Sequence, residues 1–286
     1  MTGWIFILLS SFCSVLIAHL LKFTEFKKLS TTKVLTVNYV VASLVAFLTP
    51  LGGTELDFQL QTAWPALVLA IFVGFIFIAN FFIYSKSVSK NGVGISVAAM
   101  RMSLLIPVLL STIWYLELMS TRQWIGFITV IVALFLLLPN KRRMLREPKS
   151  AAWLLVLLFL GTGLGDGSLK IFEADFSSYL TKEQFMGTVF LSATLVGFLV
   201  VLIKGNLSFS KQELGMGILV GIPNLYSAIF LIEALEVMNG AIVYSIVNTL
   251  TVLGATVLGM IRWGDIVTPV QWTGIAATLL SILLLM

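Results

Sequence analysis

Residues 82–138 read FIYSKSVSKNGVGISVAAMRMSLLIPVLLSTIWYLELMSTRQWIGFITVIVALFLLL, and residues 230–285 read FLIEALEVMNGAIVYSIVNTLTVLGATVLGMIRWGDIVTPVQWTGIAATLLSILLL. The second stretch follows the first at a constant offset of 148 positions, without a gap. This register pairs Asn91-Gly92 with Asn239-Gly240, Glu117 with Asp265, Trp124 with Trp272 and Gly126 with Gly274. A match at fixed offset over this length indicates an internal duplication.

The composition around this duplication is that of a membrane protein. Of the 286 residues 59% are hydrophobic and 11% are charged, whereas about a quarter are charged in ordinary soluble domains. An apolar stretch of about 20 residues can cross a bilayer as a helix. The sequence predicts an all-α membrane protein with ten transmembrane helices, over residues 3–21, 33–49, 64–84, 92–116, 122–139, 151–170, 184–203, 214–234, 239–261 and 269–286.

The predicted helices form two halves. We expect a five-helix repeat over residues 1–140, a basic connecting loop over 141–150 and a second five-helix repeat over 151–286. An odd number of helices in each half inverts the second repeat in the membrane, and the equivalent loops carry opposite charge, as the positive-inside rule requires. Two inverted repeats are typical of secondary transporters.

The distribution of basic residues predicts the orientation. The odd-numbered loops hold fourteen Lys and Arg residues, and the even-numbered loops hold only Arg122 and Lys182. We therefore expect a multi-pass protein of a bacterial cytoplasmic (inner) membrane, with its odd-numbered loops in the cytoplasm and both termini outside. The net charge of +5 then belongs to loops beside a membrane and does not indicate a nucleic-acid partner.

The repeat has a recognisable form. Residues 98–138 contain Pro107-Val108, then Leu116-Glu117, then Gln123 and Gly126 before a further apolar stretch. This pattern resembles the C-terminal half of an EamA-type unit of the drug/metabolite transporter (DMT) superfamily. The resemblance implies a ten-helix carrier whose central cavity is lined mainly by helices 1, 3, 4, 6, 8 and 9, without implying a substrate. The chain departs from the pattern at Ala255, which replaces the proline, and in its predicted external termini, where most relatives have cytoplasmic ones.

Arg101 is the candidate site residue that stands out most. It lies near the middle of the fourth predicted span, where an arginine costs about 2.5–3.5 kcal/mol on insertion scales. Its planar guanidinium matches a carboxylate or a phosphate. We expect a role in substrate binding or gating, and the alternative is a structural ion pair with an acidic residue of a neighbouring helix.

Two polar stripes occur at equivalent positions of the fourth and ninth spans. Ser96 and Ser103 share one face of the fourth span, and the offset of 148 places Tyr244 and Thr251 at the equivalent positions of the ninth, together with Asn248. These residues could line opposite walls of one cavity. The alternative is helix packing, because small polar side chains are common where membrane helices touch.

The sixth span contains the run Gly161-Thr-Gly-Leu-Gly-Asp-Gly-Ser-Leu-Lys170. No strand precedes this run, so it is not a phosphate-binding loop; its glycines instead allow neighbouring helices to approach closely. Asp166 and Lys170 are four residues apart and can pair, and Lys170 is also a candidate for binding an anionic substrate. Asp166 is the candidate coupling group because hydrocarbon favours a neutral carboxyl, and His19 is the second candidate because imidazole changes charge near neutral pH.

Further wall residues are predicted on the third and eighth spans. Asn80 and Tyr84 lie four residues apart, hence on one face. Asn224 and Tyr226 follow Pro223, which should kink or interrupt the eighth span. Amide and phenol groups there could bind a substrate or bond neighbouring helices.

These observations favour a secondary active transporter of a small polar metabolite, most strongly an amino acid or an organic anion, by alternating access between the two repeats. The alternative is a proton-coupled exporter of lipophilic or quaternary cations. The chain has one His and one Cys and no recognisable nucleophile or nucleotide motif, so we expect no enzyme, no metal and no cofactor. The expected partners are a small-molecule substrate, the lipid bilayer and a coupling proton, in a monomer or a homodimer.

Overall fold

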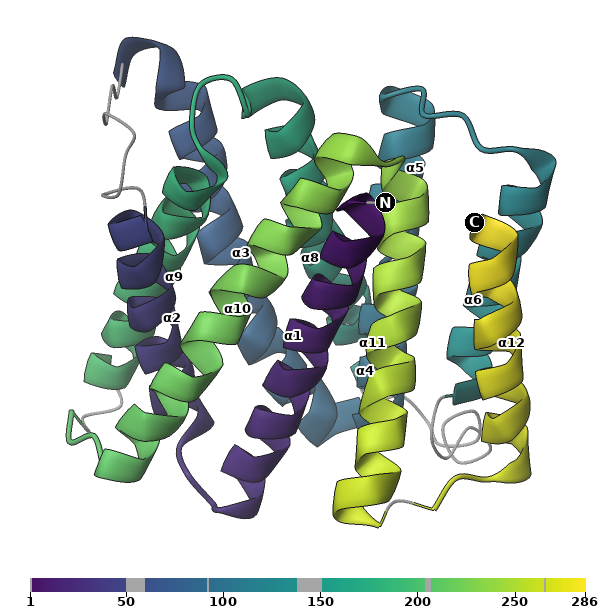
Figure 1. The fold of residues 1–286 in the computed structure, drawn as a ribbon. Helices are drawn as coiled ribbons and strands as arrows, with labels where there is room; N and C mark the ends of the chain where they lie inside the picture. Colours follow the sequence, from purple (N-terminus) through teal and green to yellow (C-terminus); the bar gives the residue numbers. More distant parts are fainter. Residues whose placement is uncertain (1, 50–59, 92, 138–150, 204–206, 265) are drawn as a thin grey trace. The chain divides into compact units, whose positions relative to one another are not determined.

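A computed structural model describes residues 2–49, 60–91, 93–137, 151–203, 207–264 and 266–286. The regular elements in these ranges are helices (Figure 1), as the sequence predicts. They are α1 (Thr2–Phe26), α2 (Thr31–Leu48), α3 (Leu60–Asn91), α4 (Val93–Met102), α5 (Leu105–Leu109), the π-helix η2 (Leu110–Trp114), α6 (Thr121–Leu137), α8 (Ala152–Ile171), the π-helix η3 (Phe172–Phe176), α9 (Lys182–Ile203), α10 (Lys211–Val237), α11 (Gly240–Trp263) and α12 (Pro269–Leu285).

Length and composition together indicate a multi-pass membrane protein. Within the described ranges, seven helices are long and apolar enough to cross a bilayer. They cover Thr2–Phe26, Thr31–Leu48, Ala63–Asn91, Ala152–Phe176, Lys182–Ile203, Lys211–Val237 and Gly240–Trp263. Three shorter apolar helical stretches, Ala99–Trp114, Thr121–Leu137 and Pro269–Leu285, occupy the places of the remaining predicted spans.

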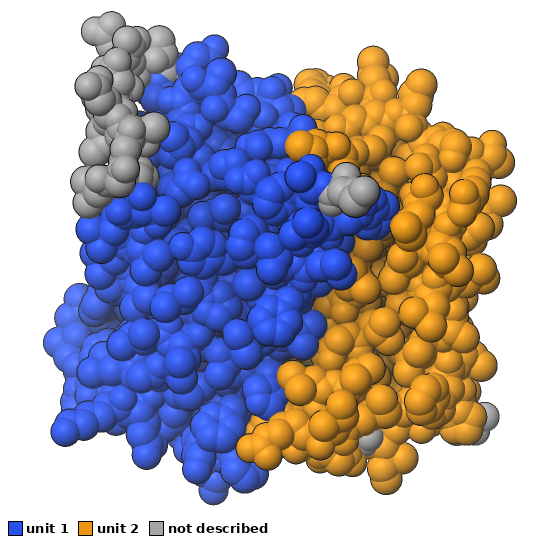
Figure 2. All heavy atoms as spheres, in the orientation of Figure 1, with its two compact units in different colours: residues 1–78, 171–236 blue, residues 79–170, 237–286 orange. Residues whose placement is uncertain are grey.

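The helices group into two compact units (Figure 2). Unit 1 comprises Met1–Ile78 and Ile171–Glu236, and unit 2 comprises Ala79–Lys170 and Val237–Met286. Each unit therefore takes segments from both halves of the sequence. The units are groups of packed helices, whereas the predicted repeats are stretches of sequence, and the predicted boundary at 141–150 lies outside the described residues.

The fourth predicted span is broken, and the expectation of one uninterrupted helix over 92–116 is wrong. Helix α4 ends at Met102, α5 begins at Leu105, and a π-helical turn follows. Pro107 has no N–H with which to bond the carbonyl of Ser103. That carbonyl accepts from Ile106 N instead, at 2.9 Å, and the Ser103 hydroxyl donates to the carbonyl of Met100 at 2.5 Å. The freed backbone groups at the break are therefore bonded locally.

Of the two effects expected of Pro223, a kink or an interruption of the eighth span, the interruption does not occur. Pro223 lies inside α10, which nevertheless continues as one helix from Lys211 to Val237. A proline within a membrane helix is tolerated when the surrounding structure satisfies the freed backbone groups.

Four helices begin at the same local motif, in which a Ser or Thr and a Gln or Glu three residues later each bond the other's backbone N–H. This capping box fixes where each helix starts. The pairs are Ser120 and Gln123 before α6, Thr181 and Gln184 before α9, Ser210 and Glu213 before α10, and Thr268 and Gln271 before α12.

Within unit 1, glycines bring α2 close to α9 and α10. A Cβ at Gly197 of α9 would lie 2.8 Å from Thr36 Oγ1, and one at Gly217 of α10 would lie 2.4 Å from Val37 Cβ. These distances leave no room for a larger side chain, so the glycines set the spacing of the helices.

Within unit 2, α6 and α12 lie side by side (Figure 1) and contact each other reciprocally. Gly126 of α6 faces Leu284 and Leu285 of α12, and Gly274 of α12 faces Leu136 and Leu137 of α6. Each residue in one contact stands 148 positions from its counterpart in the other. The amides follow the same rule: Gln123 Nε2 donates to Leu285 O at 3.5 Å, and Gln271 Nε2 donates to Leu137 O at 3.2 Å. A contact of this kind, in which i meets j and j meets i, has local two-fold symmetry.

We predict that Gly126→Val and Gly274→Val destabilise the protein by similar amounts, about 1–3 kcal/mol each. A Cβ at either position would lie 3.0 Å from leucine side-chain atoms of the other helix. Thermal unfolding in detergent measures the effect. Gly215→Val is the matched control because a Cβ there meets no atom within 4 Å, and an equal loss in all three variants would contradict the prediction.

Candidate functional site

Arg101 lies in unit 2, in the last turn of α4, directly before the break in that helix. Its Nη1 donates to Asn248 Oδ1 of α11 across 3.5 Å, a long hydrogen bond. The guanidinium also interacts electrostatically with Asp166 of α8 and Tyr84 of α3. The structure therefore brings together four residues that the sequence singled out, from four helices.

Asp166 is the acidic residue of this cluster. The part of unit 2 that the structure describes contains no direct ion pair between the Asp166 carboxylate and Arg101, although the two charges interact. The carbonyl of Asp166 accepts from the Tyr244 hydroxyl at 2.7 Å, and the Tyr244 carbonyl accepts from Asn248 Nδ2 at 3.1 Å. Tyr244 is buried. It thus ties α11 to α8 beside the two charges, and the charged side chains themselves are only partly buried.

The glycines of α8 allow α5 and η2 to pack closely against it, which confirms their predicted packing role. A Cβ at Gly163 would lie 2.4 Å from Ile106 Cδ1, and one at Gly167 would lie 3.4 Å from Leu110 Cδ2. Glycines at these positions let α5 and η2 approach the backbone of α8.

Asn80 of α3 extends the polar cluster along α8. Its Nδ2 donates to Thr162 Oγ1 at 2.8 Å, and a Cβ at Gly161 would lie 2.7 Å from its Oδ1. Within the described residues this buried Oδ1 has no hydrogen-bond partner. A buried acceptor without a donor is unfavourable by about 1–3 kcal/mol.

Lys170 forms its ion pair with Glu117 and not, as predicted, with Asp166. Its Nζ lies 2.6 Å from Glu117 Oε1 and 5.5 Å from the centroid of the Tyr115 ring. The other carboxylate oxygen of Glu117 accepts from Gly240 N, the first residue of α11, at 2.6 Å. The Lys170 side chain is 4% exposed. These contacts join the end of α8, the segment after η2 and the start of α11.

The backbone after η2 presents Glu117 to these partners. Tyr115 N bonds Leu110 O at 3.2 Å and Glu117 N bonds Ser111 O at 3.0 Å, which closes the π-helical turn. Between them Leu116 adopts a left-handed conformation, with φ of 53°. This conformation is uncommon for a residue other than glycine.

The two serines predicted on a cavity wall make packing contacts. Ser96 is buried and shares a 2.8 Å hydrogen bond with Ser87, and Ser103 bonds its own helix. Thr251 is buried on α11, one turn beyond Asn248. These contacts fit the helix-packing alternative given above for Ser and Thr.

Three predicted site residues, Asn224, Tyr226 and His19, belong to unit 1 and not to the unit that contains Arg101. Asn224 of α10 donates from Nδ2 to Asn38 Oδ1 at 3.1 Å. The ring of Tyr226 lies 5.7 Å from that of Phe230, between centroids. His19 is partly buried on α1.

Sequence reasoning missed Thr162 and Asn38, the partners of the two predicted asparagines. Thr162 lies inside the glycine run, where its hydroxyl was a visible polar group in an apolar span. Asn38 lies in the second span and is fully buried; an amide in an apolar stretch was the signal for it.

The chain is similar in sequence to one protein and in fold to a solved structure. No family model matches the chain. An uncharacterized protein of Haemophilus influenzae (strain ATCC 51907 / DSM 11121 / KW20 / Rd) is 26% identical over 279 residues, covering 94% of this chain and 93% of that protein. A crystal structure of another protein matches with a TM-score of 0.80 and 11% sequence identity, over 99% of this chain and 95% of that chain. At this identity the likeness concerns the fold alone.

We predict that Lys170→Met destabilises the protein by about 3 kcal/mol, because it leaves the Glu117 carboxylate without its cation. Thermal unfolding in detergent measures the loss. Lys170→Met combined with Glu117→Gln should recover part of it, since no unpaired charge remains. Lys211→Met, at an exposed position of α10, is the control. A double variant less stable than Lys170→Met alone would contradict this interpretation.

Proposed function

We propose that the protein is a secondary active transporter of a small polar metabolite that carries a carboxylate, and that Arg101 binds this carboxylate. The observation that carries the proposal is the cluster of Arg101, Asp166, Tyr84 and Asn248 on helices of otherwise apolar composition. Ionisable groups in such segments are expensive and in membrane proteins commonly mark substrate or ion pathways.

The acidic residue of the cluster favours an amino acid over a simple organic anion. A substrate with both charges could place its carboxylate on Arg101 and its ammonium on Asp166, because the two side chains interact without a direct ion pair. Asn80 Oδ1, which has no donor among the described residues, would accept from an ammonium or a hydroxyl. A guanidinium and a carboxylate held this way recognise both ends of a zwitterion.

Transport would proceed by alternating access between two inverted five-helix repeats of an EamA-like member of the DMT superfamily. The offset of 148 positions and the reciprocal contacts of Gly126 and Gly274 support this arrangement. The break between α4 and α5 supports it as well, since discontinuous helices commonly form the binding sites of secondary transporters. We place the protein in a bacterial inner membrane, with the basic odd-numbered loops in the cytoplasm.

The alternative of a cation exporter gives Asp166 the role of binding carboxylate. The positive charge of Arg101 interacts with Asp166. It would therefore repel a cationic substrate bound to that carboxylate. The two functions therefore predict different effects of removing the arginine.

The test is transport into liposomes that contain the purified protein, with amino acids, monocarboxylates and quaternary cations as separate substrates. We predict saturable transport of amino acids, reduced about 10- to 100-fold in Arg101→Ala, because the substrate carboxylate loses a charge-assisted hydrogen bond worth about 1.5–3 kcal/mol. Asp166→Asn should reduce amino-acid transport more than monocarboxylate transport.

Arg262→Ala is the matched control, since it removes an arginine from an exposed position of α11. Transport of cations alone, undiminished in Arg101→Ala, would select the exporter. If no class shows saturable transport, the protein is not a carrier of these metabolites.

A further inference from the structure

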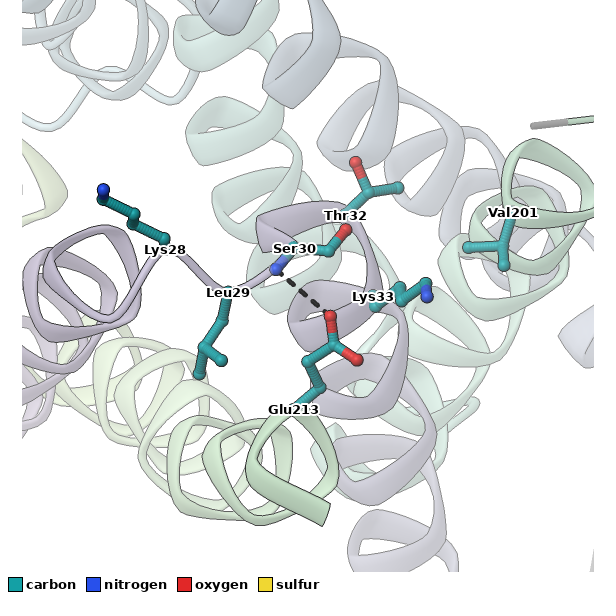
Figure 3. Close-up of a pocket in the computed structure, with 7 residues that line it drawn as sticks. All are labelled: Lys28, Leu29, Ser30, Thr32, Lys33, Val201 and Glu213. Atoms are coloured by element: carbon teal, nitrogen blue, oxygen red, sulfur yellow. Dashed lines mark hydrogen bonds between the residues drawn. The ribbon is translucent and has the colours of Figure 1, made fainter. Parts of the chain in front are cut away.

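Unit 1 contains a pocket of about 460 Å³ (Figure 3), and no residue of the cluster around Arg101 lines it. Its lining residues are Lys28, Leu29, Ser30, Thr32, Lys33, Val201 and Glu213. The lining thus combines two lysines, two hydroxyl-bearing residues and one glutamate with two apolar residues. The proposed transport function uses none of these residues.

The pocket lies where membrane-spanning helices end. Helix α1 ends at Phe26, α2 begins at Thr31, α9 ends at Ile203 and α10 begins at Lys211, and the lining residues belong to these helix ends or to the turn between α1 and α2. In a membrane protein the ends of apolar spans lie at the level of the lipid headgroups. The apolar contacts of Leu29 and Val201 beside lysines suit the boundary between headgroup and acyl chain.

Glu213, the acidic residue that lines the pocket, accepts hydrogen bonds from backbone N–H groups. Glu213 Oε1 accepts from Ser30 N at 3.2 Å, drawn as the dashed line in Figure 3, and Oε2 accepts from Ser210 N at 2.8 Å. One carboxylate thus serves the starts of both α2 and α10, so the N-terminus of α2 already has an anion. An added anion would have to be held by the lysines.

The two lysines differ in how firmly they are held. Lys33 is buried, its Nζ donates to Ser208 O at 2.5 Å and lies 5.7 Å from the centroid of the Phe209 ring. Lys28 is exposed, at the other end of the pocket in Figure 3, on a turn closed by Leu29 N to Thr24 O at 3.1 Å. An ammonium carries three donors, and the contact with Ser208 uses one of those of Lys33.

We propose that this pocket binds the phosphate headgroup of an anionic phospholipid. Lys28 and Lys33 supply the positive charge, the hydroxyls of Ser30 and Thr32 supply hydrogen bonds, and the apolar side chains meet the upper acyl chain. A free phosphate ester shares the headgroup chemistry, but it would leave the apolar lining unused. This binding is independent of the transport proposal, and either can fail without the other.

The test measures binding of phosphatidylglycerol and of phosphatidylcholine with the same acyl chains to the full chain in detergent, by native mass spectrometry and by thermal stabilisation. The variant is Lys28→Gly. Lys28 has a φ of 55°, a conformation that glycine adopts without strain, so the substitution removes the charge and keeps the turn. Lys27→Ala is the matched control, because Lys27 lies on the same turn with its ammonium 5.5 Å from the Phe23 ring centroid.

We expect wild type and Lys27→Ala to prefer phosphatidylglycerol, and Lys28→Gly to bind it about five-fold more weakly, the effect of one lysine near an anionic surface. Lys28→Arg should restore the affinity. Equal binding by Lys28→Gly and Lys27→Ala, or equal binding of the two lipids, would overturn the proposal. Equal stabilisation by inorganic phosphate or glycerol 3-phosphate would overturn the lipid as occupant and assign the pocket to a soluble phosphate.

Discussion

The structure depends on the need of every backbone N–H and carbonyl to find a partner in a medium without water. Long α-helices meet this need within each span, which is why the described residues form helices. Where the chain leaves the helix, the protein supplies the missing bonds: the break before α5 is closed by Ser103 and Ile106. Irregular backbone inside a membrane protein occurs where the surrounding protein can satisfy it. Arg101 stands next to this irregular segment.

Close approach of helices is the second constraint, because lipid offers no hydrophobic drive for helices to associate. Glycines provide that approach in both units, by facing Thr36 and Val37 in unit 1 and Ile106 in unit 2. In the contact of α6 with α12 the two glycines have equivalent roles, 148 positions apart. The duplicated sequence thus builds a symmetrical contact from two copies of one segment.

Charge is used in three different ways in this chain. Lys170 and Glu117 form a buried pair that joins helix ends. Glu213 caps two helix starts through its two oxygens. Arg101 and Asp166 interact electrostatically without a direct ion pair, and we propose that the substrate bridges them. The same residue types therefore serve anchoring, capping and, in our proposal, recognition, according to whether their bonds are already satisfied.

The sequence by itself determined the helical class and the positions of the apolar segments, because composition and period are local properties. It also identified Arg101, Asp166, Tyr84 and Asn248, since polar groups are conspicuous in apolar segments. Only the tertiary structure decided which polar residues interact. Lys170 forms an ion pair with Glu117, and Asn80 donates a hydrogen bond to Thr162. Asp166 interacts electrostatically with Arg101. Spacing along one helix shows which side chains share a face, but a neighbouring helix decides which of them meet. The break at Ser103 and the continuity of α10 through Pro223 were likewise decided by packing, because a proline removes a bond and the surrounding structure determines how the loss is accommodated.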